Sequence, residues 1–305
     1  MGRRCKVKGL LNHTDILLKA ESKAKWNKII SILSILLLIG PVMYLLSLTY
    51  YAIGDRANKQ ILALETLYSL TDPAMAINDK KVGSSISPFF GLTIDAPIIQ
   101  SYNSTEYNIG SHEVTYRFGK VISQKKNLNI PNESSETFPQ TIINKDLEDS
   151  IIELDKDSTV NAFVVFKNSV QYDQMSKFLE EYKAKSIWNA VETGKEKQAL
   201  NDSTRGTTLI GFPTDNRAPE NSDFTEDSVP AQLFYEQLAF ISSNSSMIDE
   251  LTWPITLKIK ERINYIKDNG LKLYGATLSI KVKDLEEMIK GKKISGVKII
   301  TPIMH

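Results

Sequence analysis

The side chains that could carry out chemistry are few in this chain and lie far apart along it. The three histidines are His13, His112 and His305, and the only cysteine is Cys5. A structural zinc site needs about four nitrogen or sulfur ligands held close together, and this spacing does not supply them. We therefore expect no metal site, no cofactor and no cysteine-based catalysis.

Paired carboxylates offer a second chemistry, seen at Glu148-Asp149 and Glu286-Glu287. Glycoside hydrolases use two carboxyl groups, one to donate a proton and one to attack or to activate water, but no sequence spacing identifies them. Adjacent acidic residues are far more often a solvated surface. Motifs of other enzyme classes, such as GxSxG, HExxH and GxxxxGK[ST], are absent. We predict that the chain is not an enzyme and keep a cell-wall hydrolase as a distant alternative.

Charge is strongly uneven along the chain. Residues 1–28 hold eight basic and two acidic side chains, a net of +6, whereas the whole chain has 37 basic and 36 acidic residues. The remainder therefore carries 29 basic and 34 acidic residues, a net of −5. A basic tail can bind nucleic acid, but beside an apolar segment membrane topology alone explains it. We expect no direct contact with nucleic acid.

The apolar segment at residues 29–53 contains no charged side chain. As a helix it would span about 37 Å, more than the ~30 Å hydrocarbon core of a bilayer. Gly40-Pro41 would place a kink in such a helix. No small-residue cleavage site follows, so an uncleaved anchor is favoured over a signal peptide. The basic residues before it predict a single-pass protein of the cell membrane, with a cytoplasmic N-terminus and an extracellular C-terminal domain.

Two parts of the remaining chain have the strand–helix–strand order of a βαβ unit. Apolar strand candidates at 160–166 and 186–191 flank a helix whose apolar spacing runs over 175–182, and residues 271–300 repeat the order. The two strands of such a unit are expected to lie parallel. We predict an α+β protein with a layered α/β domain that contains two βαβ units, and a ferredoxin-like sandwich is one such arrangement.

These patterns divide the chain into five expected segments. In order they are a cytoplasmic basic segment at 1–28, the transmembrane helix at 29–53, a stalk at 54–85, a strand-rich extracytoplasmic region at 86–155 and a C-terminal α/β domain at 156–305.

A short apolar stripe precedes the membrane segment. Ile16, Leu17 and Ala20 follow helical spacing, and Lys19 and Lys23 lie beside them. Such a stripe can lie on anionic lipid, or it can be a docking helix for a cytosolic protein. In the C-terminal half, Trp188 and Asn189 leave a similar choice between packing in the core and facing a ligand.

Three strings of the sequence carry a resemblance: ILLKAESKAKWNKIISILSILLLIG at 16–40, SIWNAVET at 186–193 and INYIKDNGLKLYGATLSIKVKDLEEMIKGKKISGVKI at 263–299. They resemble the Firmicutes sigma factor regulator family of membrane-bound anti-sigma factors. The resemblance covers about residues 15–60 and 155–300. From these strings we single out Trp188, Asn189, Gly270, Tyr274 and Gly275 as a signature of the outer domain.

The resemblance implies that the cytoplasmic segment holds an extracytoplasmic-function sigma factor at the membrane, and that the outer domain conveys envelope stress in transcription regulation. The stripe residues would then contact the sigma factor. One short helix buries less than the roughly 1,200–2,000 Å² of a stable interface, so the expected partners also include the lipid bilayer and a second small membrane protein. The alternative is an anchored extracellular binding or scaffold module with no cytoplasmic partner.

Overall fold

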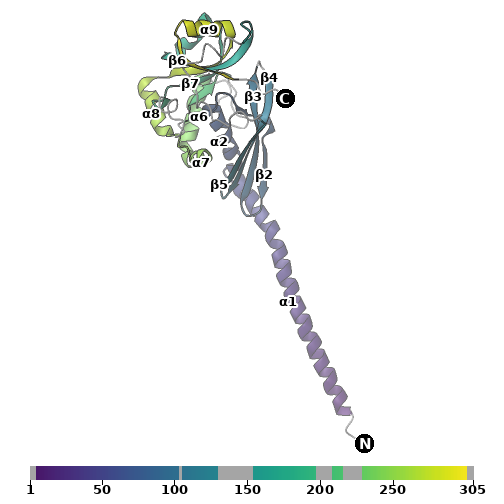
Figure 1. Ribbon diagram of the computed structural model, residues 1–305. Coiled ribbons are helices and arrows are strands. Elements are labelled where there is room, and N and C mark those ends of the chain that lie inside the picture. Colours follow the sequence, from purple (N-terminus) through teal and green to yellow (C-terminus); the bar gives the residue numbers. More distant parts are fainter. Residues whose placement is uncertain (1–4, 103–104, 130–153, 197–207, 216–228, 301–305) are drawn as a thin grey trace.

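The structure is a computed structural model that describes residues 5–102, 105–129, 154–196, 208–215 and 229–300. A single long helix, α1 (Cys5–Ala52), leads into a folded part that we call the head (residues 53–300) (Figure 1). The stretch Leu17–Ala52 is long and apolar enough to cross a membrane. The helix continues through Pro41, where a kink was predicted, without a break.

The head contains two sheets. The first, sheet A, has the order β1-β3-β4-β5 with β2 paired to β3, and all its pairs are antiparallel. Three of its strands, β3, β4 and β5, lie within the region 86–155 that was expected to be rich in strands. Its strands are β1 (Ala76–Ile77), β2 (Gly83–Ser87), β3 (Gly91–Tyr102), β4 (Thr105–Arg117) and β5 (Lys120–Leu128).

The second sheet, sheet B, has the order β10-β6-β9-β7-β8, again with antiparallel neighbours throughout. The two strands of each expected βαβ unit are therefore not neighbours in the sheet. Strands β6 and β7 run in the same direction, but β9 lies between them, just as β6 lies between β9 and β10. Its strands are β6 (Thr159–Gln171), β7 (Lys185–Val191), β8 (Gly211–Pro213), β9 (Lys272–Lys281) and β10 (Ile294–Ile300).

Helices cover both faces of sheet B. Helix α9 lies on the side remote from α1, whereas α2, α6 and α7 lie on the side toward it (Figure 1). The helices of the head are α2 (Arg56–Thr71), α4 (Met175–Glu181), α6 (Pro230–Ser243), α7 (Ser245–Thr252), α8 (Ile259–Asn269) and α9 (Val282–Lys290). Short 3-10 turns lie at Asp79–Lys81 and Tyr172–Gln174.

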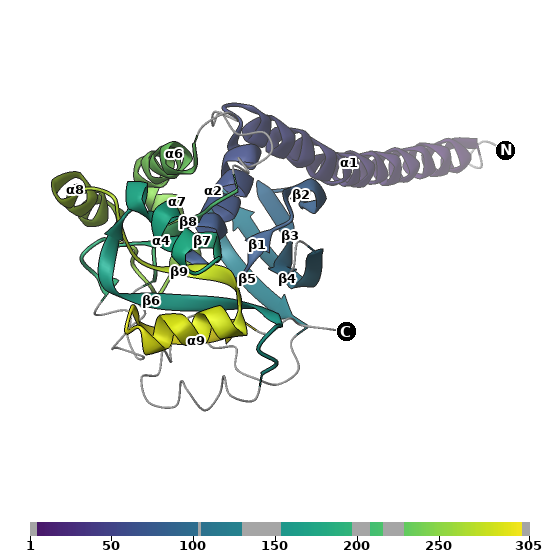
Figure 2. The same ribbon diagram turned by 90° about the horizontal axis from the view of Figure 1, so that it is seen from above.

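Helix α2 corrects the prediction of a stalk at 54–85. It packs inside the head, in contact with β1 of sheet A and β8 of sheet B, and Figure 2 shows it between the two sheets. Ala63, Leu64 and Leu70 are almost fully buried on it. Its buried residues run over 60–70 and occupy more than one face of the helix, as expected of a helix inside a core.

Candidate functional site

The predicted docking residues lie on α1, at the end remote from the head (Figure 1). Leu17, Lys19, Ala20 and Lys23 are exposed to solvent. The backbone of Ile16 belongs to the same helix, while its side chain lies outside the described residues. Because α1 is one continuous helix, it connects these residues to the head.

Trp188 packs in the core of the head. Its side chain is 3% exposed and its indole Nε1 donates a hydrogen bond of 2.9 Å to the Ser69 carbonyl oxygen of α2. It also lines a cavity described below. The neighbouring Asn189 is buried, and its Oδ1 accepts a 2.8 Å hydrogen bond from Ser186. Trp188 therefore anchors α2 onto sheet B.

The residues after this strand hold helix α8. The Arg262 guanidinium is 2% exposed and donates hydrogen bonds to Thr193 Oγ1 at 2.8 Å, to the Leu257 carbonyl at 2.8 Å and to the Thr208 carbonyl at 2.9 Å. Thr193 in turn donates to the Glu196 carboxylate. We call Arg262, Thr193 and Glu196 the arginine latch. It joins the end of β7 to α8.

The other signature residues have backbone and packing roles. Gly270 ends α8 with φ at +77°. A Cβ at Gly275 would lie 2.4 Å from the Val164 carbonyl oxygen of the neighbouring strand. Tyr274 is buried beside the latch, and burial, followed by the Glu196 charge, holds the pKa of its hydroxyl well above the ordinary value. Tyr274 and Gly275 lie in the central strand β9 of sheet B, whereas Gly270 lies at the end of α8.

A cavity of about 690 Å³ lies between the two sheets and the C-terminal end of α2. Of the described residues that line it, Lys80 is the basic one, whereas the acidic ones are Glu65, Asp72, Asp79, Glu106 and Asp215. Burial raises the pKa of the Asp72 carboxyl, and the Lys126 charge and the backbone N–H groups of Ala74 and Met75 oppose that shift. The cavity is acidic in character.

Polar side chains in the cavity wall join the two sheets. Asn161 of β6 donates a 3.1 Å hydrogen bond to the Ser101 carbonyl of β3, and Thr277 of β9 donates one of 3.1 Å to the Pro73 carbonyl. Asn161 Oδ1 is buried without a hydrogen-bond partner among the described residues. This arrangement suits a ligand that donates hydrogen bonds or carries positive charge.

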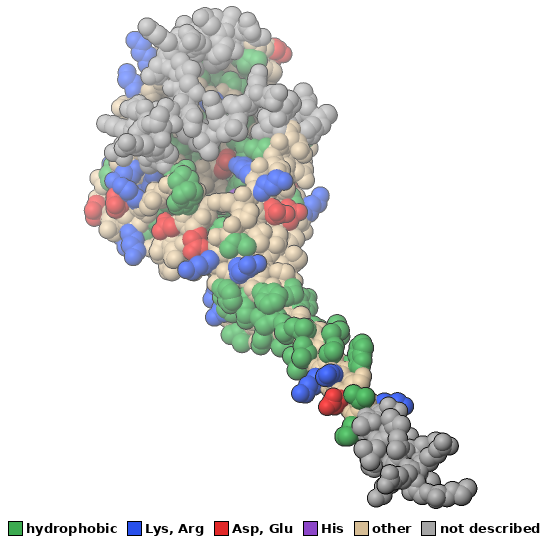
Figure 3. All heavy atoms as spheres, turned by 60° about the horizontal axis from the view of Figure 1, so that its bottom comes forward, with side chains coloured by type: hydrophobic (Ala, Val, Ile, Leu, Met, Phe, Trp, Pro, Cys, Tyr) green, Lys and Arg blue, Asp and Glu red, His purple; other side chains and the backbone are tan. Residues whose placement is uncertain are grey.

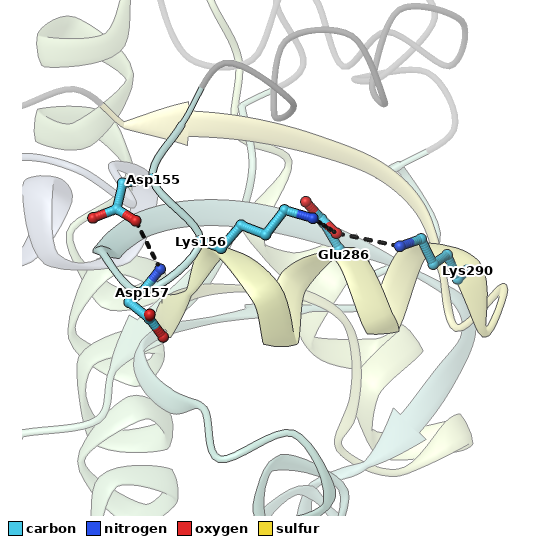
Figure 4. Close-up of polar contacts among 5 residues, drawn as sticks. All are labelled: Asp155, Lys156, Asp157, Glu286 and Lys290. Atoms are coloured by element: carbon cyan, nitrogen blue, oxygen red, sulfur yellow. Dashed lines mark hydrogen bonds and ion pairs between the residues drawn. The ribbon is translucent and has the colours of Figure 1, made fainter.

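No group of three His, Cys, Asp or Glu side chains in the described part of the chain could hold a metal ion. Glu286 lies on α9 between Lys156 at 3.5 Å and Lys290 at 3.2 Å (Figure 4), and the Lys290 hydrogen bond is the main cause of its lowered pKa. It belongs to a surface ion-pair network, while Glu148-Asp149 falls outside the described residues.

His112 is the one described histidine and lies buried in sheet A. Its Nδ1 is 3.2 Å from the Tyr68 hydroxyl, and burial, helped by the Lys126 charge, lowers its pKa to about 4. The unfolded chain binds this proton near pH 6.5 and the folded chain does not, so stability is lost as the pH falls from about 6.5 to about 4. We expect that loss to approach about 3 kcal/mol.

Comparison of the wild type with His112→Gln isolates this histidine from the carboxylates. Chemical unfolding of the full chain in detergent should give free energies that diverge with pH, the wild type losing more on acidification. Parallel curves for the two proteins between pH 7 and pH 4.5 would show that His112 is protonated as readily in the folded state as in the unfolded one.

Sequence patterns singled out Trp188 of the cavity wall but missed Asp72, Asn161 and Arg262. Asn161 lay within the strand predicted at 160–166, and Asp72 within the segment 54–85 predicted as a stalk. Arg262 did carry a signal, because with Ile259 and Ile266 it completes the buried face of α8. A charged residue within an apolar helical stripe indicates a buried, hydrogen-bonded cation.

Two comparisons with known proteins found similar sequences. Residues 151–299 match the family model described as "Sigma factor regulator C-terminal". The "Probable anti-sigma-M factor YhdL" of Bacillus subtilis (strain 168) is 23% identical over 298 residues, which cover 92% of this chain and 80% of that protein. No solved structure matches the chain. Residues 151–299 therefore belong to the sigma factor regulator family, and the apolar N-terminal helix ahead of them fits a single-pass membrane protein.

Proposed function

We propose that this regulator is an anti-sigma factor that holds an extracytoplasmic-function sigma factor at the cytoplasmic face of the cell membrane. The similarity to an anti-sigma factor over most of the chain supports the proposal. The net charge of +6 in residues 1–28 supports a cytoplasmic N-terminus, because basic residues beside a membrane helix stay inside. The head then lies outside the cell.

The observation that carries the proposal is the continuity of α1. The helix begins beyond the predicted docking residues and ends inside the head, where Ser47 and Tyr51 are 0% and 1% exposed. Tyr51 donates a 2.9 Å hydrogen bond to the Phe90 carbonyl of the loop between β2 and β3. A movement of the head therefore moves α1, which supplies a mechanical route from the head to a bound sigma factor.

We also infer that the head responds to the state of the cell envelope through the cavity. Helix α2 follows α1 after only a short turn, and its C-terminal end, with Ser69 and Asp72, lines the cavity. A ligand that enters between the sheets would push on α2 and hence on α1. The acidic lining favours a cationic or hydrogen-bond-donating ligand.

The double substitution Ile16→Asp with Leu17→Asp tests sigma-factor binding. Two carboxylates on the apolar stripe would have to be desolvated at a helical interface, which costs several kcal/mol. We expect the sigma factor to be released, to disappear from the co-purified membrane fraction, and to induce its regulon at least about tenfold. A reporter gene under a promoter of that sigma factor provides the measurement.

The matched control is Leu18→Asp with Ser22→Asp, which adds the same charge to the opposite side of the same helix. It should leave the reporter silent. If the stripe variant is also silent, or if residues 1–24 can be exchanged for an unrelated basic sequence without effect, the anchored scaffold module becomes the better reading. In the same strain, a chain shortened to residues 1–53 tests sensing by the head. If the reporter still responds to cell-wall damage with that chain, sensing by the head is excluded.

We further propose that sheet B is the sheet of a ferredoxin-like fold. In the order β10-β6-β9-β7, the parallel strands β6 and β7 lie on either side of β9, and the parallel strands β9 and β10 lie on either side of β6. This is the arrangement of a split βαβ unit, with α4 and α9 as the two crossover helices. Helices α6, α7 and α8 would be an insertion between the two halves. An experimental structure with a different strand order would refute this.

A further inference from the structure

The junction between α1 and the head is built from aromatic rings. Tyr50 of α1 contacts Phe90 at 5.4 Å and Phe118 at 6.4 Å between ring centroids, and Phe90 stacks on Phe118 at 4.5 Å. Phe90 belongs to the tip of the β2–β3 hairpin and Phe118 to that of the β4–β5 hairpin. Together with Phe89 we call these residues the aromatic collar.

Hydrogen bonds fix the position of the collar along α1. The Phe90 backbone N–H donates to Ser47 Oγ at 2.8 Å, and that hydroxyl donates to the Met43 carbonyl at 2.7 Å. On the second hairpin, the Gly119 carbonyl accepts a 3.3 Å bond from the Gln60 side chain of α2. The first tip is therefore held at Ser47 and the second at the start of α2, and both lie at the end of the head nearest to the free length of α1 (Figure 1).

Ser47 lies at the edge of the membrane if α1 spans it. The rise from Ile29 to Ser47 is about 27 Å, close to the ~30 Å hydrocarbon core. Immediately before this level Leu45 and Leu46 are 62% and 48% exposed, as expected of side chains that face lipid. The collar thus meets the bilayer at the interfacial layer.

The composition of the tips suits that layer and not water. Phe89 and Phe118 are 53% and 56% exposed, although they occupy turn positions with φ of +63° and +52°. Such positions normally hold Gly, Asn or Asp, and the left-handed conformation costs a bulky residue about 1–2 kcal/mol. Burial of both rings in an apolar layer would offset that cost.

Basic side chains lie at the border of the collar. Arg56, Arg117 and Lys120 are exposed next to it, and the Arg56 guanidinium lies 4.1 Å from the Tyr50 ring centroid. Figure 3, viewed from the α1 end, shows the apolar surface of α1 running onto the base of the head, with Lys and Arg side chains along its border. Aromatic rings flanked by cations are the usual anchors at lipid headgroups.

We propose that the aromatic collar is a second membrane contact, with which the head sits directly on the bilayer surface at the Ser47 end of α1. The occupant of this surface is lipid, since the collar continues the lipid-facing side of α1. The inference rests on α1 spanning the membrane. It predicts that head and α1 move as one body against the membrane, so that a force on the head is not lost in a flexible linker.

Depth measurements on the full chain test the collar. In a Cys5→Ser background, an environment-sensitive fluorophore is attached through Phe89→Cys, Phe118→Cys or, as a control on α9 at the remote end of the head, Lys290→Cys. Single copies are placed in lipid nanodiscs of phosphatidylcholine and phosphatidylglycerol that contain nitroxide-labelled lipid. We expect at least about threefold stronger quenching at residues 89 and 118 than at 290. Equal quenching at the three sites would overturn the proposal.

Unmodified chain gives a second measurement that does not depend on the labelled variants. A photoactivatable phospholipid should cross-link peptides that contain residues 88–90 and 117–119 as well as those of α1. Absence of cross-links in the two hairpin peptides, with α1 cross-linked, would refute the lipid contact. If the hairpin tips are shielded from water only in discs that hold two or more copies of the chain, the lipid contact is refuted as well. The collar would then be assigned to a contact with a neighbouring protein.

Discussion

Replacement of Arg262 by Met should unfold the head at a markedly lower temperature. The side chain is 2% exposed and makes three hydrogen bonds, to Thr193, Leu257 and Thr208. Methionine fills a similar volume but leaves two carbonyl groups without donors and the Glu196 carboxylate without a nearby cation. Breaking a buried charged network on one side costs about 3–5 kcal/mol.

Thermal unfolding of the full chain, followed by near-ultraviolet circular dichroism in detergent, provides the measurement. For a head of this size we expect the Tm to fall by about 10 °C or more. The Arg262→Lys protein keeps the charge, but its lysine cannot reach three acceptors. Its Tm should therefore lie between those of the wild type and the Arg262→Met protein. Lys260→Met on the exposed side of α8 is the matched control and should melt like the wild type. Equal melting of the 260 and 262 variants would contradict the latch.

Local patterns located the elements of the head more readily than their pairing. The strand at 160–166, the helix around 175–182 and the repeat at 271–300 are all present as β6, α4 and β9–α9–β10. Apolar spacing reports which face of an element is buried, but it carries no record of the strand that lies beside it. The position of β9 between β6 and β7 depends on residues about a hundred positions apart, which no local pattern can reveal.

The same limit applies to the cavity and the collar. The cavity combines Asp72 from the end of α2 with Asn161 from β6 and Thr277 from β9. The collar joins the end of α1 to two hairpin tips, and the phenylalanines at 89, 90 and 118 break the usual turn chemistry. An aromatic residue in a tight turn is a local anomaly that sequence can flag, while the surface on which it rests appears only in the fold.

Gly275→Ala should destabilise the centre of sheet B although it adds one methyl group. Gly275 pairs with Val165 on one side and with Ala190 on the other, so β9 cannot move away from either neighbour. The new Cβ would lie 2.4 Å from the Val164 carbonyl oxygen, closer than van der Waals contact permits. Overpacking in a core typically costs about 1–3 kcal/mol, and here backbone must shift on both sides, so we expect about 2–3 kcal/mol.

Gly83→Ala supplies the matched comparison, because the nearest atom to a Cβ there is the Asp95 carbonyl oxygen at 3.9 Å. Its Tm should stay at or slightly above the wild-type value, since alanine restricts the unfolded chain. The Gly275→Ala protein should melt about 5–10 °C lower. Wild-type melting of both variants would show that β6 and β9 do not approach as closely as the fold requires. The signature glycine would then have to be explained by a contact with a partner.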